Sequence, residues 1–430
     1  MNTEELKDII LLQREEMEEK FEKFKIIERE MGKSHLLRFL EHPNILAIIG
    51  VRRCGKSVFS WQLFSGKKFG YINFDDERLA EIKANDLNKV LQAFYEIYGT
   101  DIEYFVLDEP QNIEKWELFA NRLRRTKKVI VTGSNSQLLS GELATALTGR
   151  YISFELFPFS FREFLEYRGV EVSTFQTTKN ISQIKRSLAE YLKTGGLPET
   201  YLFGREMAFR IYSDIIEKDI IRRLRVRKRS ALKELAKYLL TNSAKEITYR
   251  KLSHVFEIKD VHTVKNWIGG LENGYLFFIL ERFSPKLKEQ IIAPKKVYCI
   301  DNGIITSASF RLSENTGRLM ENLVAIELLR RKSYWHRNWE IFYWKDHQGR
   351  EVDFVVREDL KVKQLIQVTY ASAKDEIEQR EIKSLLKAGD VFKNSKPELV
   401  VVTWDFEGEE EVKGKRVKFV PLWRWLIGNR

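Results

Sequence analysis

One short stretch of the chain combines two glycines, a lysine and a serine at the spacing that phosphate binding requires. Gly50, Gly55, Lys56 and Ser57 fit the pattern G-x-x-x-x-G-K-[ST], between an apolar run at 45–49 and a helical pattern. In such a loop the backbone N–H groups curl around phosphate oxygens, the lysine reaches the β- and γ-phosphates, and the serine hydroxyl binds Mg²⁺. A chance match to this loose pattern is the alternative. The expected ATP–Mg²⁺ site comprises Gly50, Val51, Arg52, Arg53, Cys54, Gly55, Lys56, Ser57 and Val58.

A pair of carboxylates further along the chain could complete this chemistry. An apolar run at 104–107 ends in Asp108 and Glu109. Asp108 would support the Mg²⁺ shell and Glu109 would orient and deprotonate the attacking water, which is the division of roles that ATP hydrolysis needs. The alternative is a simple turn at a strand end. A further strand at 128–132 runs into the polar segment 133–136, whose side chains would sense the γ-phosphate.

The elements that must position these residues alternate along the chain. Strand-like runs are separated by helical patterns, which predicts a parallel sheet between helices. Before them, residues 4–31 have the pattern of a charged amphipathic helix with Leu6 and Met17 on its apolar stripe. The expected strands lie at 45–49, 69–74, 103–107, 128–132 and 151–155.

Taken together, these residues resemble the AAA+ ATPases, in particular a prokaryotic and archaeal branch whose members share a C-terminal domain of poorly defined function. The resemblance runs from about residue 30 to the end. It implies that Ser134 or Asn135 occupies the sensor position and that Arg150 matches the arginine finger, which stabilises charge on the transferred phosphoryl group. Whether Arg150 acts on its own site or a neighbour's stays open, as does a surface arginine paired with a carboxylate. Further motifs that carry the resemblance are Phe74-Asp75-Asp76-Glu77-Arg78, Leu147-Thr148-Gly149-Arg150-Tyr151, Leu156-Phe157-Pro158-Phe159-Ser160-Phe161-Arg162-Glu163-Phe164 and Gly195-Gly196-Leu197-Pro198-Glu199.

Length and composition agree with a multidomain enzyme of the cytoplasm. A chain of 430 residues predicts two or three domains. No apolar run approaches the length of a membrane span and the first residues have no apolar leader, so neither secretion nor a membrane partner is expected. Only two cysteines, Cys54 and Cys299, occur, far apart, which argues against a disulfide framework or a structural zinc site.

Positive charge favours a polyanionic partner. The formal net charge is +11, and part of it gathers behind an expected helical lid at about 180–225. Seven basic residues and no acidic one lie within twelve positions, a concentrated electrostatic footprint for phosphates. A solvated linker is the alternative. The seven are Arg222, Arg223, Arg225, Arg227, Lys228, Arg229 and Lys233.

The segment after this basic run resembles a winged helix. Helical patterns at 231–240, 248–256 and 260–273 are followed by a strand at 275–280. The resemblance implies that the third helix enters a DNA major groove, although such a domain also serves as a packing unit beside an ATPase. The outward candidates on this helix are His262, Thr263, Lys265 and Asn266.

The last third of the chain resembles the PD-(D/E)XK nuclease fold. Nucleases of this type need Asp and Glu to hold Mg²⁺ and a Lys to activate water. Glu321, on a helix at 317–332, and Asp353, on a strand, match the carboxylates, but Gln367 and Thr369 stand where an acidic residue and the lysine belong. Glutamine offers the metal only a neutral carbonyl, and threonine carries no positive charge. We therefore expect a nuclease-like fold that has lost cleavage but still grips DNA or a protein.

The sequence as a whole predicts an α/β AAA+ ATPase that uses ATP and Mg²⁺ to drive a conformational cycle on DNA. Two rivals stay open: a metal-dependent nuclease under ATP control, and an ATP-switched signalling or scaffold protein that recognises another protein. A homo-oligomer is also open. The expected parts are an N-terminal helix (1–34), the AAA+ core (35–167), a helical lid with basic linker (168–230), a winged helix (231–290) and a nuclease-like domain (291–430).

Overall fold

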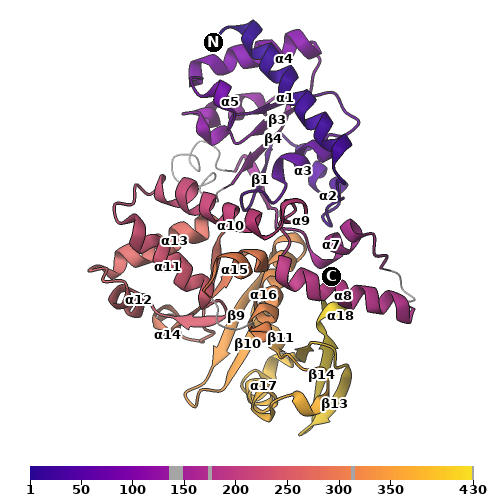
Figure 1. Ribbon diagram of the computed structural model, residues 1–430, viewed down its shortest axis with the longest axis vertical. Helices are drawn as coiled ribbons and strands as arrows, with labels where there is room; N and C mark the ends of the chain where they lie inside the picture. Colours follow the sequence, from indigo (N-terminus) through magenta and orange to yellow (C-terminus); the bar gives the residue numbers. More distant parts are fainter. Residues whose placement is uncertain (135–148, 173–176, 311–314, 429–430) are drawn as a thin grey trace. The chain divides into compact units, whose positions relative to one another are not determined.

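The chain forms two compact units (Figure 1), which the computed structural model describes over residues 1–134, 149–172, 177–310 and 315–428. The first unit comprises Met1–Phe157 with Asn273–Tyr275, and the second comprises Pro158–Glu272 with Leu276–Arg430. Among these described residues, the first unit holds the glycine-rich loop and a single sheet, and the second unit holds two further sheets.

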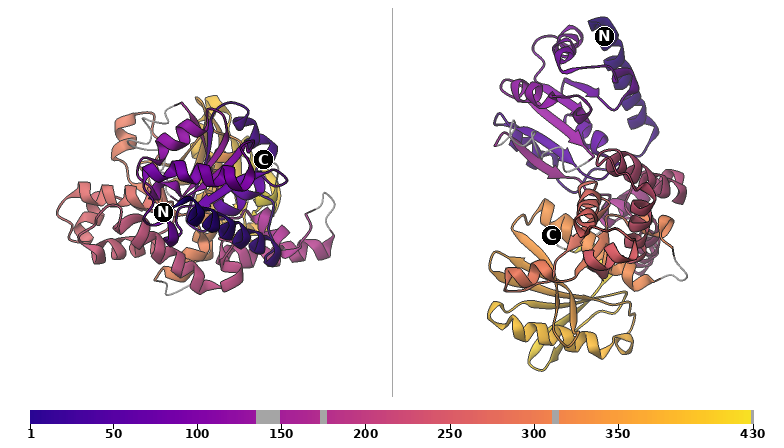
Figure 2. Two further views of the ribbon diagram at one scale, coloured as in Figure 1. Left: turned by 90° about the horizontal axis from the view of Figure 1, so that it is seen from above. Right: turned by 90° about the vertical axis from the view of Figure 1, so that its left-hand side faces the viewer.

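The sheet of the first unit has five parallel strands in the order β2-β3-β4-β1-β5 (Figures 1 and 2). Every residue of β1 is buried, as expected for a parallel sheet with helices on both faces. The predicted parallel sheet is therefore confirmed. Its strands are β1 (Ile45–Ile49), β2 (Phe69–Asn73), β3 (Tyr104–Asp108), β4 (Lys128–Gly133) and β5 (Tyr151–Glu155).

The N-terminal helix packs against α4 and β2. It begins at an Asn2 cap and ends at Lys23, although its charge and apolar pattern predict a helix to residue 31. Beyond Lys23 the backbone is irregular because it bonds to other elements instead: the Gln62 side chain donates to the carbonyl oxygen of Ile27 over 3.1 Å. The helices of this unit are α1 (Thr3–Lys23), α2 (Lys33–Leu37), α3 (Lys56–Leu63), α4 (Leu87–Tyr98) and α5 (Trp116–Leu123).

The second unit opens with a run of helices that ends in a π-helical segment, η6. The Gly195–Glu199 motif forms the break between α8 and α9. Within the described ranges of both units, no helix is long and apolar enough to cross a membrane. The helices of this run are α7 (Phe161–Arg168), α8 (Thr178–Thr194), α9 (Thr200–Phe203), α10 (Arg205–Asp214) and η6 (Ile215–Ile221).

Three helices and a small antiparallel sheet follow. The sheet order is β6-β8-β7, so β8 pairs with both other strands. The three helices lie where the sequence predicts them. The elements β6 and α14 were not predicted from the sequence, because each is too short to show a clear apolar periodicity. The elements are α11 (Arg229–Thr241), β6 (Lys245–Ile247), α12 (Tyr249–Val255), α13 (Val261–Asn273), β7 (Phe277–Leu280), α14 (Leu287–Ile292) and β8 (Lys295–Cys299).

A six-stranded mixed sheet completes the second unit (Figure 2), in the order β13-β14-β12-β11-β10-β9. β9, β10 and β11 form an antiparallel meander, while β11, β12 and β14 run parallel. Helix α17 packs on β10 and β11, and α16 contacts β8, β9 and β11. The elements are α15 (Asn302–Ala308), α16 (Thr316–Tyr334), β9 (Trp339–Lys345), β10 (Glu351–Glu358), β11 (Lys361–Val368), α17 (Gln379–Val391), β12 (Glu398–Thr403), β13 (Gly408–Val412), β14 (Lys415–Pro421) and α18 (Leu422–Ile427).

Candidate nucleotide-binding site and a lysine-centred carboxylate cluster

The glycine-rich loop connects the end of β1 to the start of α3. Gly50 has φ 151°, and a Cβ built on it would lie 2.2 Å from the carbonyl oxygen of Leu156, so no larger residue fits. Gly55 has φ 96°, a left-handed conformation that glycine adopts without strain. Helix α3 begins at Lys56. The loop therefore leads directly to the N-terminus of a helix, whose free N–H groups and dipole favour a phosphate anion.

Lys56 lies over this loop. Its Nζ donates hydrogen bonds to the carbonyl oxygens of Gly50, over 3.1 Å, and of Val51, over 3.0 Å. The same nitrogen is 4.0 Å from Oε1 of Glu109. Only 6% of the lysine is exposed, so its charge is directed at the loop and its neighbouring carboxylate.

Asp108 is a hydrogen-bonded carboxylate near the loop. It is buried at the end of β3, where Oδ2 accepts a 2.7 Å hydrogen bond from the Tyr71 hydroxyl and Oδ1 accepts one from Thr132. Burial raises its pKa, as does the charge of Glu109, while hydrogen bonds from Thr132, Ser57 and Tyr71 lower it. Ser57 and Asp108, the two predicted metal-holding residues, are thus neighbours. A hydroxyl backed by a carboxylate is an oxygen donor set that suits Mg²⁺.

Glu109 adopts a left-handed backbone conformation, with φ 49° and ψ 45°, which is uncommon for a residue with a side chain. Its N–H donates to the Thr132 hydroxyl over 3.1 Å. Oε2 of Glu109 accepts two hydrogen bonds from Ser134, one from the backbone N–H over 3.3 Å and one from the hydroxyl over 3.4 Å. The Gln111 side chain donates a further hydrogen bond to the same atom. These contacts hold the Glu109 carboxylate on the side of Lys56 and connect it to the end of β4.

Several residues of this site lie outside the sequence motifs. Arg29 is buried in the irregular segment after α1, and its guanidinium donates to the carbonyl oxygens of Cys54, over 3.1 Å, and Phe157, over 2.5 Å. Arg29 therefore braces the back of the loop from outside the motif. Tyr71 and Thr132 were missed for a similar reason, because each is one buried strand residue among many. The only available signal was that both are polar positions in otherwise apolar strands.

The thiol of Cys54 is directed away from the phosphate-binding side of the loop. Its Sγ donates to the carbonyl oxygen of Leu156 over 3.4 Å, and burial raises its pKa. Cys54 therefore contributes backbone and packing to the loop. Both cysteines, Cys54 and Cys299, are buried free thiols.

Arg150 lies at the other end of the sheet from the loop. Its carbonyl oxygen accepts a 2.9 Å hydrogen bond from the N–H of Ile45, the first residue of β1, whereas the loop follows Ile49, the last. At about 3.3 Å per residue along a strand, roughly 15 Å separates the Arg150 backbone from Gly50. Arg150 is therefore not part of the cluster formed by Lys56 and its neighbours. Asn135, the other predicted sensor residue, lies outside the described residues.

A second set of charged residues lies in the other unit, around Lys296 of β8. Its Nζ is 2.8 Å from Oε1 of Glu321, 2.7 Å from Oε1 of Glu351 and 3.0 Å from Oδ1 of Asp353. The Tyr298 hydroxyl also donates to Oε1 of Glu321, over 2.7 Å. Lys296 is only 2% exposed. Burial alone would lower its pKa, but the surrounding carboxylates raise the pKa well above its usual value, so the side chain is an ammonium ion.

The predicted nuclease residues gather only in part around this ammonium. Gln367 donates from Nε2 to Oδ2 of Asp353 over 2.8 Å, and its own Oε1 has no hydrogen-bond partner in the described part of the chain. The Thr369 side chain instead lies beside Glu381, whose pKa burial raises to about 7. Across the described ranges, no group of three or more His, Cys, Asp or Glu side chains is arranged to hold a metal ion. Lys296, which the sequence analysis did not identify, takes the central position between Glu321 and Asp353.

The Gly195–Glu199 motif packs closely against Asp301. Asp301 is buried, caps α15, and accepts a 2.6 Å hydrogen bond from the N–H of Gly196. A Cβ on Gly195 would lie 2.1 Å from Oδ1 of Asp301, so this contact requires glycine. Burial raises the pKa of Asp301 to about 6 although several backbone N–H groups lower it. These motif residues therefore fix the packing of the second unit.

Three family profiles match successive parts of the chain. An AAA domain matches residues 42–165 and so includes the loop, both carboxylates and all five strands of the first sheet. Residues 185–316 match a domain of unknown function, DUF8612, and residues 316–425 match another, DUF4143. Together with the sheet order, the first match shows an AAA+ P-loop ATPase-like domain.

Relatives that match most of the chain occur in an archaeon and a bacterium. The chain is 34% identical over 405 residues to the uncharacterised protein MJ1544 of Methanocaldococcus jannaschii, covering 90% of this chain and 89% of that protein. It is 29% identical over 417 residues to an uncharacterised protein of Haemophilus influenzae, covering 93% and 98%.

Similarity to solved structures is distant. The Aeropyrum pernix ORC1 protein, solved in complex with DNA, gives a TM-score of 0.31 at 13% identity, covering 71% of this chain and 94% of that one. A Pyrococcus horikoshii signal transduction ATPase with numerous domains gives a TM-score of 0.25 at 12% identity, covering 71% of this chain and 46% of that one. Scores at this level carry no argument about function.

Proposed function

This chain belongs to the family of the Methanocaldococcus jannaschii protein MJ1544, and we propose that it is an ATPase that couples ATP–Mg²⁺ hydrolysis to a conformational cycle on DNA. The observation that carries the ATPase part is the convergence of Lys56, Ser57, Asp108 and Glu109 at one edge of the parallel sheet. Binding alone needs only the loop and its lysine, whereas hydrolysis also needs a positioned base.

Each residue of the cluster has a distinct role in this proposal. Bound Mg²⁺ would supply positive charge to the β- and γ-phosphates. Lys56 would leave the carbonyl oxygens that it now bonds and neutralise phosphate charge. Ser57 would ligate the metal, with Asp108 orienting that shell. Glu109, restrained by Ser134, would accept a proton from the attacking water.

For Arg150 we propose a role in a neighbouring copy of the chain. Its position at the far end of the parallel sheet argues against contact with the phosphates of its own loop, as the register of Ile45 indicates. An arginine finger acting on another subunit's site stabilises transition-state charge only in an assembly. The proposal therefore includes a homo-oligomer as the active form.

The DNA part of the proposal has two supports. The chain order is α11, β6, α12, α13, β7, α14, β8, and β8 lies between β6 and β7 in the sheet. This order agrees with a winged helix, in which α13 would be the recognition helix. On α13, His262, Lys265 and Asn266 are exposed and Thr263 is half-buried. Exposed polar side chains at the start of a recognition helix are those that read base edges.

We also propose that the C-terminal sheet does not cleave DNA. The αβββαβ order of α16, β9, β10, β11, α17 and β12 supports the nuclease-like fold. Its carboxylates, however, already share a buried counter-ion in Lys296. A second cation placed among the same oxygens would meet the ammonium directly, and like charges at such distances repel strongly.

Variants of the phosphate loop and the following carboxylate test the ATPase assignment. Lys56→Ala should abolish nucleotide binding. Glu109→Gln should bind a fluorescent ATP analogue normally while phosphate release falls by about 10²- to 10⁴-fold, the range for loss of a general base. Glu103→Gln, an exposed glutamate at the opposite end of the same strand, is the matched control. Equal turnover in Glu109→Gln and the unaltered chain would refute the assignment.

The DNA assignment is tested by measuring phosphate release with and without duplex and single-stranded DNA. Stimulation by either form would connect ATP turnover to nucleic acid. A chain that hydrolyses ATP but has no affinity for DNA at low salt would favour the signalling or scaffold alternative.

A further inference from the structure

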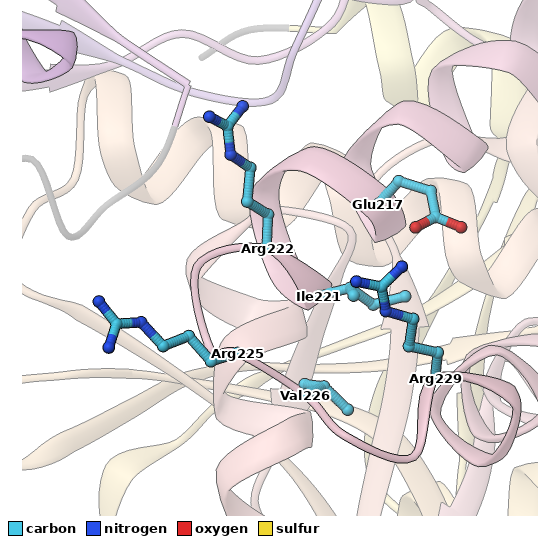
Figure 3. Close-up of a pocket in the computed structure, with 6 residues that line it drawn as sticks. All are labelled: Glu217, Ile221, Arg222, Arg225, Val226 and Arg229. Carbon is cyan, nitrogen blue, oxygen red and sulfur yellow. The ribbon is translucent and has the colours of Figure 1, made fainter.

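A pocket with an apolar floor and an arginine rim lies in the second unit (Figure 3). Its volume is about 490 Å³, within the range of roughly 300–1,000 Å³ that is usual for small-ligand sites. The side chains of Ile221 and Val226 are buried, at 2% and 7% exposure, whereas the arginines are exposed. The lining residues are Glu217, Ile221, Arg222, Arg225, Val226 and Arg229.

The backbone of this segment is shaped to present those arginines. The π-helical turn η6 closes with the N–H of Arg222 donating to the carbonyl oxygen of Glu217 over 3.1 Å. Arg225 then takes a left-handed φ of 49°, and the chain turns so that Arg229 begins α11. Figure 3 shows the three arginines coming from separate points around this turn. π-helical turns and left-handed residues with side chains are both enriched at functional sites.

The rim carries an uncompensated positive charge. Within the described part of the chain, Arg222, Arg225 and Arg229 have neither an ion pair nor a side-chain hydrogen bond. The one lining carboxylate, Glu217, already pairs with Lys233. Neighbouring Arg223 differs, because it lies 3.8 Å from the buried Asp219. Three of the basic residues in this run are thus left for an external anion.

The turn that carries the three arginines, residues 221–229, also packs against α13. A Cβ on Gly270 would lie 2.5 Å from Cδ1 of Leu224 and 3.5 Å from Cγ2 of Ile220, so the small glycine allows the turn to pack closely on this helix. The pocket and the exposed side chains of α13 therefore belong to one connected region of the second unit. A ligand that contacts both must extend beyond a single phosphate.

We propose that the arginine pocket binds the sugar–phosphate backbone of a nucleic acid strand. Guanidinium groups pair bidentately with phosphate oxygens, and the apolar floor of Ile221 and Val226 accommodates a sugar ring. A nucleic acid fits better than a free phosphate because the basic run continues past the pocket, at Arg227 and Lys228, and the pocket adjoins α13. This inference rests on the proposed action on DNA and assigns that action to a definite site.

Salt-dependent binding of a labelled mixed-sequence 20-base-pair duplex to the full chain tests the proposal. Each phosphate contact contributes about 0.9 to the slope of log K against log salt. The triple variant Arg222→Gln/Arg225→Gln/Arg229→Gln should lower that slope by about 2 to 3. If the affinities converge at 1 M salt, this amounts to a loss of about 10²- to 10³-fold at 0.1 M. The triple Arg→Lys variant keeps the charge and should keep most of the slope.

A matched control removes the same charge elsewhere in the second unit. Lys361, Lys387 and Lys413 are exposed lysines of the C-terminal sheet region, and changing all three to Gln should leave the slope nearly unchanged. Because the three arginines are exposed, the pocket variants should unfold at the same temperature as the unaltered chain.

The outcomes separate this inference from the function on which it rests. If the unaltered chain has no affinity for duplex at low salt, the proposed action on DNA fails. If it binds but the pocket variant and the lysine control have equal slopes, the pocket assignment fails while DNA binding stands. If calorimetry with inorganic phosphate shows binding that the pocket variant loses while duplex binding is unchanged, the pocket is a small-anion site and the proposal is wrong.

Discussion

Replacing Lys296 with methionine should destabilise the second unit by an unusually large amount. Methionine keeps most of the volume of the lysine side chain, so packing is largely preserved and the change removes charge. The ammonium now lies within 2.7–3.0 Å of Glu321, Glu351 and Asp353. Its loss leaves buried carboxylates without their common counter-ion.

The magnitude follows from the burial of the group. Removing one partner of a buried ion pair costs about 3–5 kcal/mol, because the remaining charge stays desolvated. Three carboxylates share Lys296, which places the change toward the top of that range. With an m-value of about 3 kcal/mol/M, the urea midpoint should fall by about 1–2 M.

The adjacent lysine provides the control. Lys295 points to the other face of β8 and makes a single 2.8 Å pair with Glu281, whose side chain is 42% exposed. Lys295→Met should therefore cost about 1 kcal/mol or less. Both variants are compared by urea unfolding monitored by circular dichroism at neutral pH. A Lys296→Met chain as stable as Lys295→Met would refute the account of Lys296 as an internal cation.

Two further predictions concern Arg150 and Asp301. Arg150→Ala should lower phosphate release by about 10³-fold or more. Mixing this variant with Glu109→Gln should restore turnover, because one chain supplies the intact Glu109 and the other supplies the intact Arg150. A mixture as inactive as either variant alone would contradict action between copies. Burial raises the pKa of Asp301 to about 6. Between about pH 4 and 6, the folded chain therefore binds more protons at Asp301 than the unfolded chain does. The contribution of Asp301 to the free energy of unfolding should fall by about 3 kcal/mol as pH rises through that window. Asp301→Asn has no titrating group at this position. In urea unfolding, the difference in free energy of unfolding between this variant and the unaltered chain should therefore change by about 3 kcal/mol between pH 4 and 7. A difference that stays constant with pH would contradict the raised pKa of Asp301.

Local sequence was sufficient to predict the parallel sheet and the geometry of its loop. The strands of the first unit are apolar runs of five or six residues, and Gly50 and Gly55 adopt the backbone conformations that their motif requires. These features depend on residues close together in the chain. The same holds for the helices α11, α12 and α13, whose apolar periodicity is strong.

Contacts between distant residues could not be read in this way. Arg29 reaches the loop from an irregular segment whose amphipathic pattern predicts helix, because side-chain and backbone bonds to α3 and the loop replace helical ones. Lys296 is separated from Asp353 by 57 positions in the sequence. The sequence of β8 itself does not distinguish the buried Lys296 from the adjacent Lys295.

The buried lysine gives Glu321 of α16 and Asp353 of β10 a role that does not depend on a metal. Carboxylates without a metal or another counter-ion would be costly in this interior. Lys296 supplies that charge from β8 of the three-stranded sheet, so the acidic residues stabilise the packing of β8, α16 and β10 on one another. Once the acidic residues have this structural role, their presence no longer argues for cleavage. Under the proposed function, hydrolysis is assigned to the loop, Asp108 and Glu109, while Asp353 of the C-terminal sheet pairs with Lys296 of β8.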